Sequence, residues 1–209
     1  CLNAASVTIW KDVPGVLNGD PRVFENTQLL NQISYAEAIE LAFYGASVIH
    51  PKTLQPLQRK EIPLYVRSFI NPEGAGTSVS KGKTLDPYIP CYILKPKQVL
   101  IRLSSLDFSF IVEDNISEIF ALLYQHQMRV DLIQNSAISF SVCVNNKYNR
   151  LEELLKNLRS KFKVTVFENV DLHTVRHFDS KALTSIENQK EKILLEQRAQ
   201  ETIQYVVER

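Results

Sequence analysis

The feature that most constrains the fold is an alternation of two hydrophobic periods between residues 98 and 166. Apolar side chains occupy every second position in residues 99–103 and 138–144, which is the period of a strand. They recur every three or four positions in residues 116–123 and 151–162, which is the period of a helix. A chain that switches between these periods needs a sheet on which both helical stripes can be buried.

Two further short strands complete this pattern, at residues 131–133 and from residue 164 onward. The order is then strand, helix, strand, strand, helix, strand. Two right-handed crossovers in this order predict an antiparallel sheet with both helices on one face, the ferredoxin-like arrangement. We expect Asn115 to cap the first helix.

The remainder of the chain looks like a second copy of this unit that stops early. Its expected elements are a strand over 172–178, a helix over 180–189 and strands over 192–196 and 202–207. A spare strand over 89–94 could complete the second sheet. The first copy would then be inserted within the second.

The N-terminal segment has a different pattern, with a strand over residues 5–10 followed by a long loop rich in Gly and Pro. Ser34 and Glu37 form a capping-box pattern in which each side chain would satisfy an amide at the start of a helix. The helix should begin at Tyr35 and end at Gly45.

A shorter helix and a strand are expected to follow. Pro51 suits the first turn of a helix over 53–59, and residues 64–67 have the composition of a strand. Residues 71–90 are rich in Gly and Pro, so we place a domain boundary near residue 90. Strand residues so close to Cys1 indicate a chain cut from something longer.

Composition argues against several classes of protein. The 24 Lys and Arg against 23 Asp and Glu give a net charge of +1, so no global field favours nucleic acid or a membrane. No stretch approaches the roughly 18 apolar residues of a membrane span. Cys1, Cys91 and Cys143 show no C-x-x-C spacing, which favours reduced thiols and a cytoplasmic location.

Lys11 and Arg22 form a candidate phosphate site, because they lie on loops punctuated by Gly15, Gly19 and Pro21. Cations on such loops can approach phosphate oxygens closely, and Arg can do so with two parallel donors. The alternative is a surface loop with two solvated charges.

A set of motifs across residues 5–80 closely resembles the aspartate kinase family, in the family's order and spacing. The motifs are TIWKDVPGV at 8–16, DPR at 20–22, SYAEA at 34–38, YGA to HP at 44–51, IP at 62–63, NP at 71–72 and GT at 76–77. The resemblance implies that residues 1–88 are the C-terminal, ATP-binding part of an α/β amino acid kinase domain. In that family the γ-phosphoryl group of ATP passes to the β-carboxylate of aspartate.

Carried over position by position, the resemblance implies a nucleotide site. Lys11 and Asp12 would line the nucleotide and Arg22 would meet its phosphates. Ser47 and Val48 would flank the adenine. Leu17 stands where the family often has Tyr, and Ser47 where it often has Lys, so a lower nucleotide affinity is expected.

The resemblance also bears on catalysis and metals. The family's K-F-G-G-T motif and its aspartate-binding residues are absent from the sequence, so the chain alone is expected to be inactive. Mg would come only with ATP, with no metal on protein ligands. His173 and His177 lie in a predicted strand, where positions four apart do not chelate one ion easily. His50 and His126 are interpreted as structural, His50 as a hydrogen-bond donor.

The ferredoxin-like unit resembles the ACT domain, giving α+β domains over 89–170 and, incomplete, over 171–209. In the family the effector amino acid binds around a V-D-L-I pattern, here Val130 and Asp131 with the two residues that follow. Asp131 would pair the effector's ammonium, and Asn135 and Ser136 would donate to its carboxylate.

Further implications concern the rest of the effector site. Asp114 and Asn115 stand in the loop before the first helix, where the family often has Gly, and Ala137 stands where it is often acidic. The effector would be lysine or threonine, in a homodimer formed through the ACT domains. The alternative reading is that Asp131 merely begins a strand.

Three other functions stay open at this stage. The chain could be a non-catalytic amino-acid-binding module, or the regulatory part of a bifunctional aspartokinase–homoserine dehydrogenase. A ferredoxin-like RNA binder is the third, although residues 97–104 lack the paired aromatics that stack on bases.

Overall fold

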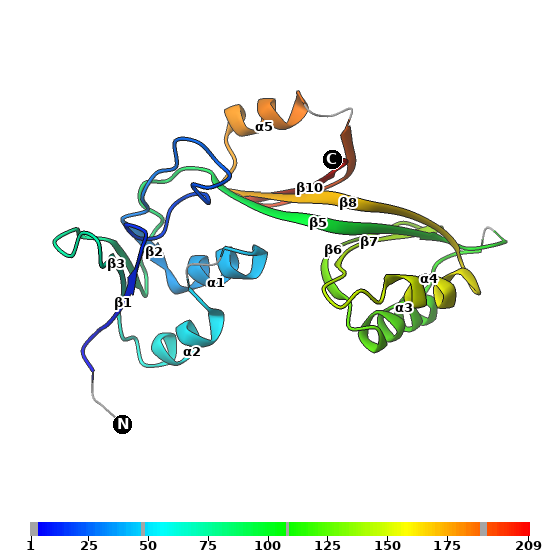
Figure 1. Cartoon of the computed structure of the whole chain (residues 1–209), viewed down its shortest axis with the longest axis horizontal. Coiled ribbons are helices and arrows are strands. Elements are labelled where there is room, and N and C mark those ends of the chain that lie inside the picture. The colour runs from blue at the N-terminus through cyan, green and yellow to red at the C-terminus, as the bar shows by residue number, and fades with distance from the viewer. Residues whose placement is uncertain (1–3, 47–48, 108, 189–191) are drawn as a thin grey trace. The chain divides into compact units, whose positions relative to one another are not determined.

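The computed structural model describes residues 4–46, 49–107, 109–188 and 192–209 (Figure 1). The chain divides into two compact units. Unit 1 comprises Cys1–Leu94, Thr174–Asn188 and Gln200–Ile203, and unit 2 comprises Lys95–His173, Gln189–Ala199 and Gln204–Arg209. Each unit is therefore assembled from separate pieces of sequence.

Unit 1 contains a mixed sheet with the strand order β1-β3-β4-β2. β1 runs parallel to β3 and β2 parallel to β4, whereas β3 and β4 are antiparallel. The strands are β1 (Val7–Lys11), β2 (Gln32–Ser34), β3 (Leu64–Ser68) and β4 (Thr77–Ser80). The helices of this unit are α1 (Tyr35–Tyr44), α2 (Pro51–Arg59) and α5 (Ser180–Glu187).

Helix α1 begins and ends where the sequence predicts. Ser34 Oγ accepts a hydrogen bond from the Glu37 amide at 3.0 Å, and Gly45 ends the helix with φ of 121°. The other half of the expected capping box is wrong. The Glu37 carboxylate binds Arg176 instead, 139 residues further along the chain.

Helix α2 begins at Pro51, as expected, and His50 is its N-cap. His50 is structural but acts as an acceptor, since its Nδ1 receives the Lys52 amide at 3.2 Å. Strand β4 lies inside the segment that sequence analysis read as turns and boundary. Val79 is the single large apolar residue of β4, so its pairing with β3, not its own composition, makes it a strand.

The ferredoxin-like pattern is confirmed. Its elements are β5 (Cys91–Ser104), α3 (Glu113–Gln125), β6 (Arg129–Asn135), β7 (Ser139–Asn145), α4 (Leu151–Arg159) and β8 (Lys163–Arg176). Their strands stand in the order β6-β7-β5-β8, and β10 (Thr202–Val207) and β9 (Ile193–Ala199) extend the sheet beyond β8. β5 and β8 are each one continuous strand where sequence analysis expected two.

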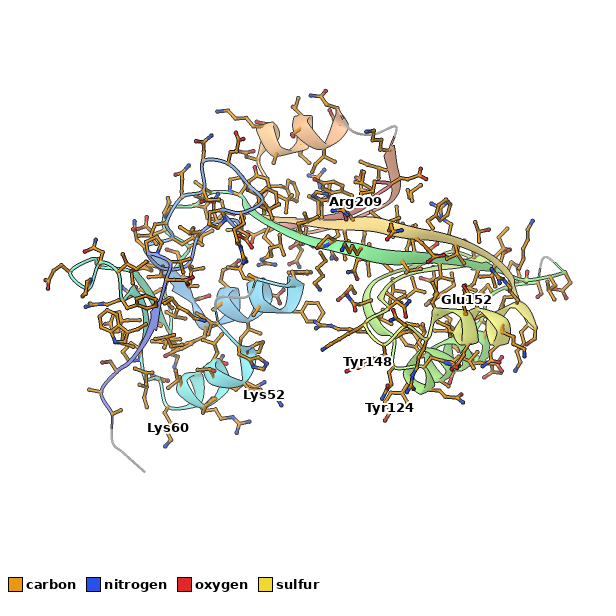
Figure 2. The ribbon with its side chains drawn as sticks, in the orientation of Figure 1. Lys52, Lys60, Tyr124, Tyr148, Glu152 and Arg209 are labelled. Atoms are coloured by element: carbon orange, nitrogen blue, oxygen red, sulfur yellow. The ribbon has the colours of Figure 1, made fainter. Side chains whose placement is uncertain are left out.

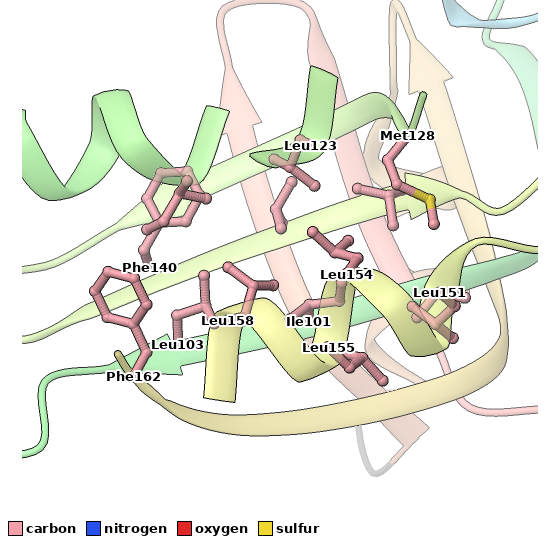
Figure 3. Close-up of a cluster of buried hydrophobic side chains, with 14 of the residues drawn as sticks. Ile101, Leu103, Leu123, Met128, Phe140, Leu151, Leu154, Leu155, Leu158 and Phe162 are labelled. Carbon is pink, nitrogen blue, oxygen red and sulfur yellow. The ribbon is translucent and has the colours of Figure 1, made fainter. Parts of the chain in front are cut away.

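Both helices of unit 2 pack on one face of its sheet (Figure 1). In the core, Leu123 of α3 and Leu154 of α4 meet Ile101 of β5 and Phe140 of β7 (Figure 3). All four side chains are at most 1% exposed. Burying each contributes on the order of 1.5–3 kcal/mol, so this layer accounts for much of the unit's stability.

The opposite face of the unit 2 sheet buries a second cluster. Its members are Leu100, Leu132, Cys143, Val170, Leu172, Leu195 and Val206. Gln134 on edge strand β6 donates to the Glu196 carbonyl on the other edge strand, β9, at 3.3 Å. The sheet therefore curls so that its two edges approach each other.

The start of α3 differs from the sequence expectation. The N-cap of α3 is Val112, not Asn115, and Asn115 at the third helical position accepts the Val112 amide at 3.0 Å. Cys91 and Cys143 are buried free thiols, and burial raises the pKa of each to about 12. No helix in the described ranges is long and apolar enough to cross a membrane.

Candidate functional site

Unit 1 holds a cavity of about 380 Å³ between the loop after β1, the C-terminal end of α1 and the first residues of β5. The structure brings Lys11, Asp12, Leu17 and Arg22 together in its wall. Lys11 and Arg22 were selected as a candidate phosphate site from their loops, and Asp12 and Leu17 by resemblance alone. The predicted adenine-flanking residues Ser47 and Val48 lie outside the described residues. The neighbouring Gly45 and Ala46 line the cavity.

Thr77 of β4 fixes the loop that forms one wall. Its fully buried hydroxyl accepts the Val16 amide at 2.8 Å and donates to the Leu30 carbonyl at 2.6 Å. Gly15 is required beside it, because an added Cβ would lie 2.5 Å from the Thr77 hydroxyl oxygen. The Gly in the V-P-G-V run thus allows close approach of backbone to strand.

Asn18 joins the same loop to the start of β5, a role that sequence analysis missed. Its side chain donates to the Pro90 carbonyl at 2.9 Å and accepts the Gln28 amide at 2.7 Å. Its own carbonyl accepts the Tyr92 amide at 2.7 Å. The N-G-D-P turn predicts that Asn18 lies in a loop, but the sequence pattern cannot predict a hydrogen-bond partner 72 positions away.

Charges on the cavity wall are balanced. Arg22 makes a two-pronged contact with Asp20, with Nε–Oδ1 of 3.0 Å and Nη2–Oδ2 of 2.7 Å. The hydrogen bonds from Arg22 hold the pKa of Asp20 below its usual value. The Arg22 side chain is 81% exposed, and surface pairs of this kind contribute little. Arg22 can therefore exchange Asp20 for a phosphate at low cost.

The rest of the wall is apolar. Leu17, Leu41 and Ala46 contribute aliphatic surface, and the rings of Phe24 and Tyr92 lie with centroids 5.7 Å apart. Small-molecule sites typically combine such a surface with a few polar groups and enclose 300–1,000 Å³. The donor set of Lys11 and Arg22 beside this surface fits a purine nucleotide with its phosphates.

A second cluster of functional groups in unit 1 is a buried charge network on α1. Arg176 donates two hydrogen bonds to the Glu37 carboxylate, from Nε at 2.9 Å and from Nη2 at 2.8 Å. It also reaches Glu40 at 3.4 Å and the Thr202 hydroxyl at 2.9 Å. Burial raises the pKa of Glu37, but the nearby His177 ring and the hydrogen bonds from Arg176 lower it to about 2.

His177 extends this network to the turn between β9 and β10. Its ring nitrogens lie 3.0 Å from Glu37 and 3.1 Å from Glu201, but neither contact has hydrogen-bond geometry. The ring of Tyr88 lies 5.1 Å from the imidazole, and its hydroxyl reaches Glu201 at 3.2 Å. The network holds α1, whose last turn supplies Leu41 to the cavity.

His126 and His173 of unit 2 both have structural contacts. His126 is buried and lies 3.0 Å from the Asn157 amide nitrogen, so it is structural, as interpreted from the sequence. His173 stacks on Tyr205 within β8 and β10, and burial lowers its pKa. No group of three or more His, Cys, Asp or Glu suited to a metal occurs in the described ranges.

In unit 2, the expected effector residues lie on β6, in the turn after it and in the first turn of α3. Asp131 is buried, with its side chain 4% exposed, and Lys95 Nζ lies 2.7 Å from its Oδ1. Arg129 Nε lies 3.5 Å from the same oxygen. The carboxylate that was expected to meet an effector's ammonium therefore already has a lysine ammonium beside it.

The other expected effector residues gather at one end of this unit. Asn135 ends β6, and Ser136 Oγ lies 2.7 Å from Ser139 Oγ. The Ile111 amide donates to the Ala137 carbonyl at 2.8 Å, so the loop before α3 meets the β6–β7 turn. Asp114 and Asn115 follow in the first turn of α3.

Comparison with known proteins first gives the class. Residues 1–68, which carry β1, α1, α2 and most of the cavity loop, match the amino acid kinase family. This agrees with a mixed α/β unit built around a candidate nucleotide cavity.

Longer matches relate the chain to the aspartokinases. The chain is 37% identical to lysine-sensitive aspartokinase 3 of Escherichia coli over 144 residues, 69% of this chain and 32% of that protein. It is 28% identical to the carrot (Daucus carota) bifunctional aspartokinase/homoserine dehydrogenase over 170 residues, 78% of this chain and 18% of that protein. The chain is homologous to the aspartokinases, which confirms the resemblance inferred from its motifs.

A solved structure extends the likeness to almost the whole chain. The crystal structure of E. coli aspartokinase III in complex with aspartate and ADP matches with a TM-score of 0.79 and 30% identity. The match covers 98% of this chain and 49% of that one. The chain thus spans about half the length of the solved aspartokinase and a third or less of the two curated relatives named above.

Proposed function

We propose that this chain is the nucleotide-side and regulatory part of an ATP:aspartate phosphotransferase. The observation that carries the proposal is the cavity of unit 1, whose wall holds Lys11, Asp12, Leu17 and Arg22. These are the described positions that family motifs assign to the nucleotide, and the similar E. coli enzyme was solved with ADP.

In this proposal the cavity side chains divide between the phosphates and the base of the nucleotide. Lys11 and Arg22 would bind the phosphates, and Arg22 would leave Asp20 to do so. Leu17, Leu41 and Ala46 would face the base. Bound ATP, with its Mg, would supply the phosphoryl group, whereas the acceptor site would come from sequence of the family that this chain does not contain.

Unit 2 is proposed as an ACT regulatory domain that binds an amino acid and joins two copies of the chain. The ferredoxin-like order supports the domain type, and the residues that the family uses gather around β6. One relative is described as lysine-sensitive, which favours lysine over threonine as the first effector to test. Asn135 and Ser136 would donate to its carboxylate.

The nucleotide proposal is tested by titrating the chain with MgATP in a calorimeter. Lys11→Ala should weaken binding by about tenfold or more, since a charge-assisted hydrogen bond contributes roughly 1.5–3 kcal/mol. Lys60→Ala is the matched control, because Lys60 projects from the end of α2, away from the cavity residues (Figure 2). Equal affinity in both variants would place the nucleotide elsewhere.

Catalysis is tested separately by a coupled assay with ATP and aspartate. The 209-residue chain should show only background hydrolysis, because the K-F-G-G-T motif and the aspartate-binding residues are absent from its sequence. Turnover that follows aspartate concentration would overturn the assignment of the acceptor site to other sequence.

A second candidate function is a non-catalytic amino-acid sensor in which unit 1 is only scaffold. The balanced charges around Arg22 are the observation that favours it. The MgATP titration separates the two, since a sensor would bind an amino acid but no nucleotide.

A further inference from the structure

The buried ion pair of Lys95 and Asp131 in unit 2 is explained neither by catalysis nor by core packing. Lys95 Nζ and Asp131 Oδ1 are 2.7 Å apart, with side chains 18% and 4% exposed. Arg129, the other cation near Asp131, is 66% exposed and 3.5 Å away. Lys95 is thus the closer and more buried partner of the carboxylate.

A bulge in β6 explains why an acidic side chain is buried here. β6 and β7 pair in regular register except between Val130, opposite Val144, and Leu132, opposite Cys143. Asp131 is the extra residue. Val130 and Ile133 pack on the helix-covered core, whereas Leu132 packs in the cluster on the other face. The additional residue of the bulge thus holds its carboxylate at a fixed, desolvated position.

A desolvated carboxylate at a fixed position selects its partner by charge and shape. Burying it ionised requires a cation within hydrogen-bond distance, and removing that cation leaves a costly unpaired charge. The cation present is a primary ammonium on a flexible four-carbon stem. A free amino acid carries the same chemical group, and two ammonium groups cannot occupy one 2.7 Å position.

We infer that Lys95 is a tethered competitor for a primary-ammonium site at Asp131. Amino-acid binding there requires the Lys95 side chain to move away from Asp131. Lys95 therefore lowers the affinity of the site and raises the amino-acid concentration needed to occupy it. The inference rests on the effector function proposed for unit 2, but the ammonium site itself can be tested without any amino acid.

The experiment is chemical rescue of Lys95→Ala in the full chain. Ethylammonium and propylammonium chloride are titrated against sodium chloride at equal ionic strength, and the melting temperature is measured. Lys163→Ala is the matched control, because it removes an exposed lysine from β8 of the same unit. Lys95→Ala with Asp131→Asn removes both members of the pair.

We expect a saturable rise in melting temperature for Lys95→Ala alone. The parent, Lys163→Ala and the double variant should respond to alkylammonium as they do to sodium. If Lys95→Ala does not fold by itself, recovery of folded protein on refolding with propylammonium is the measurement. No rescue, or equal rescue of the double variant, would overturn the inference.

A second arm separates this result from the effector function. Lysine and threonine are titrated against the parent and Lys95→Ala, with at least tenfold tighter binding expected in the variant. Rescue by alkylammonium without any amino-acid binding would support the ammonium site and refute the proposed effector role. Equal amino-acid affinity in both proteins would show that Lys95 does not compete.

Discussion

At the scale of single residues, Glu37 makes the stability of unit 1 depend on pH. Its pKa is about 2 in the folded chain, against 4.5 for the free side chain. Between these values the unfolded chain binds more protons, so stability rises with pH. The contribution is complete above about pH 5 and is lost as pH falls toward 2. The difference of 2.5 in pKa corresponds to about 3 kcal/mol.

The measurement is urea unfolding between pH 2 and 6, followed by the fluorescence of Trp10. Trp10 is the single tryptophan of the sequence and lies in β1, so it reports on unit 1. Glu37→Gln should flatten the pH dependence in this window. Glu61→Gln removes an exposed carboxylate paired with Lys81 and should leave it intact. An unchanged slope in Glu37→Gln would contradict the assignment.

The sequence predicted the ends of helices correctly where residues a few positions away determine them. The cap at Ser34, the stop at Gly45 and the start at Pro51 each depend on contacts within a few positions. The partners of Glu37 could not be predicted, because S-x-x-E is also the pattern of a local capping box. Arg176 competes for the carboxylate only once the fold brings it there.

At the scale of elements, Thr77 couples strand β4 to the cavity loop. Thr77→Val keeps the shape of the side chain but leaves the buried Val16 amide and Leu30 carbonyl unpaired. We expect a loss of about 2–3 kcal/mol in unfolding free energy and weaker MgATP binding. Thermal unfolding and calorimetry measure the two effects.

Ser78→Ala is the control for this prediction. The neighbouring hydroxyl makes a longer contact of 3.3 Å with the Asn31 carbonyl, at an exposed position. Its removal should cost well under 1 kcal/mol and leave nucleotide binding unchanged. Comparable losses in both variants would mean that the buried hydroxyl has no special role in the loop.

The elements of unit 2 were easier to predict than those of unit 1. The alternation of apolar residues in 138–144 predicts only a strand, and the apolar stripe of α4 predicts only a helix. The structure has both elements. β4 and the bulge at Asp131 were missed, since pairing partners determine them and periodicity does not. Family motifs assigned the cavity residues to a nucleotide, whereas Lys11 and Arg22 on their loops indicated by themselves only a possible phosphate site.

At the scale of the whole molecule, the chain is expected to form a homodimer through unit 2. β6 and β9 are the two edge strands of the sheet and are not paired with each other, and an unpaired edge attracts a further strand unless it is protected. Tyr124 projects from α3 with 87% of its side chain exposed (Figure 2). The other exposed large apolar side chains among the described residues of this unit are Leu106, Phe110, Val112, Phe120, Ile138 and Tyr148. A second copy would cover these groups symmetrically.

Light scattering during size exclusion, at low micromolar concentration, should give about twice the 23.9 kDa chain mass. Phe110→Asp, at a residue 69% exposed, should shift the mass toward a monomer without lowering the melting temperature of the isolated chain. Phe69→Asp is the control, because Phe69 is an exposed aromatic of unit 1. A parent that runs as a monomer would refute the dimer.

The division of unit 1 into three pieces of sequence has a consequence for synthesis on the ribosome. Unit 1 draws on Cys1–Leu94 but also on Thr174–Asn188 and Gln200–Ile203. Glu37 emerges 139 residues before Arg176, its partner. At translation rates of roughly 5–20 residues per second, that delay is on the order of 7–30 s. During this delay α1 carries an acid without its partner and unit 1 stays unfinished, while the ribosome makes Lys95–His173, the longest piece of unit 2. The nascent chain should therefore fold much of unit 2 before unit 1 can be completed.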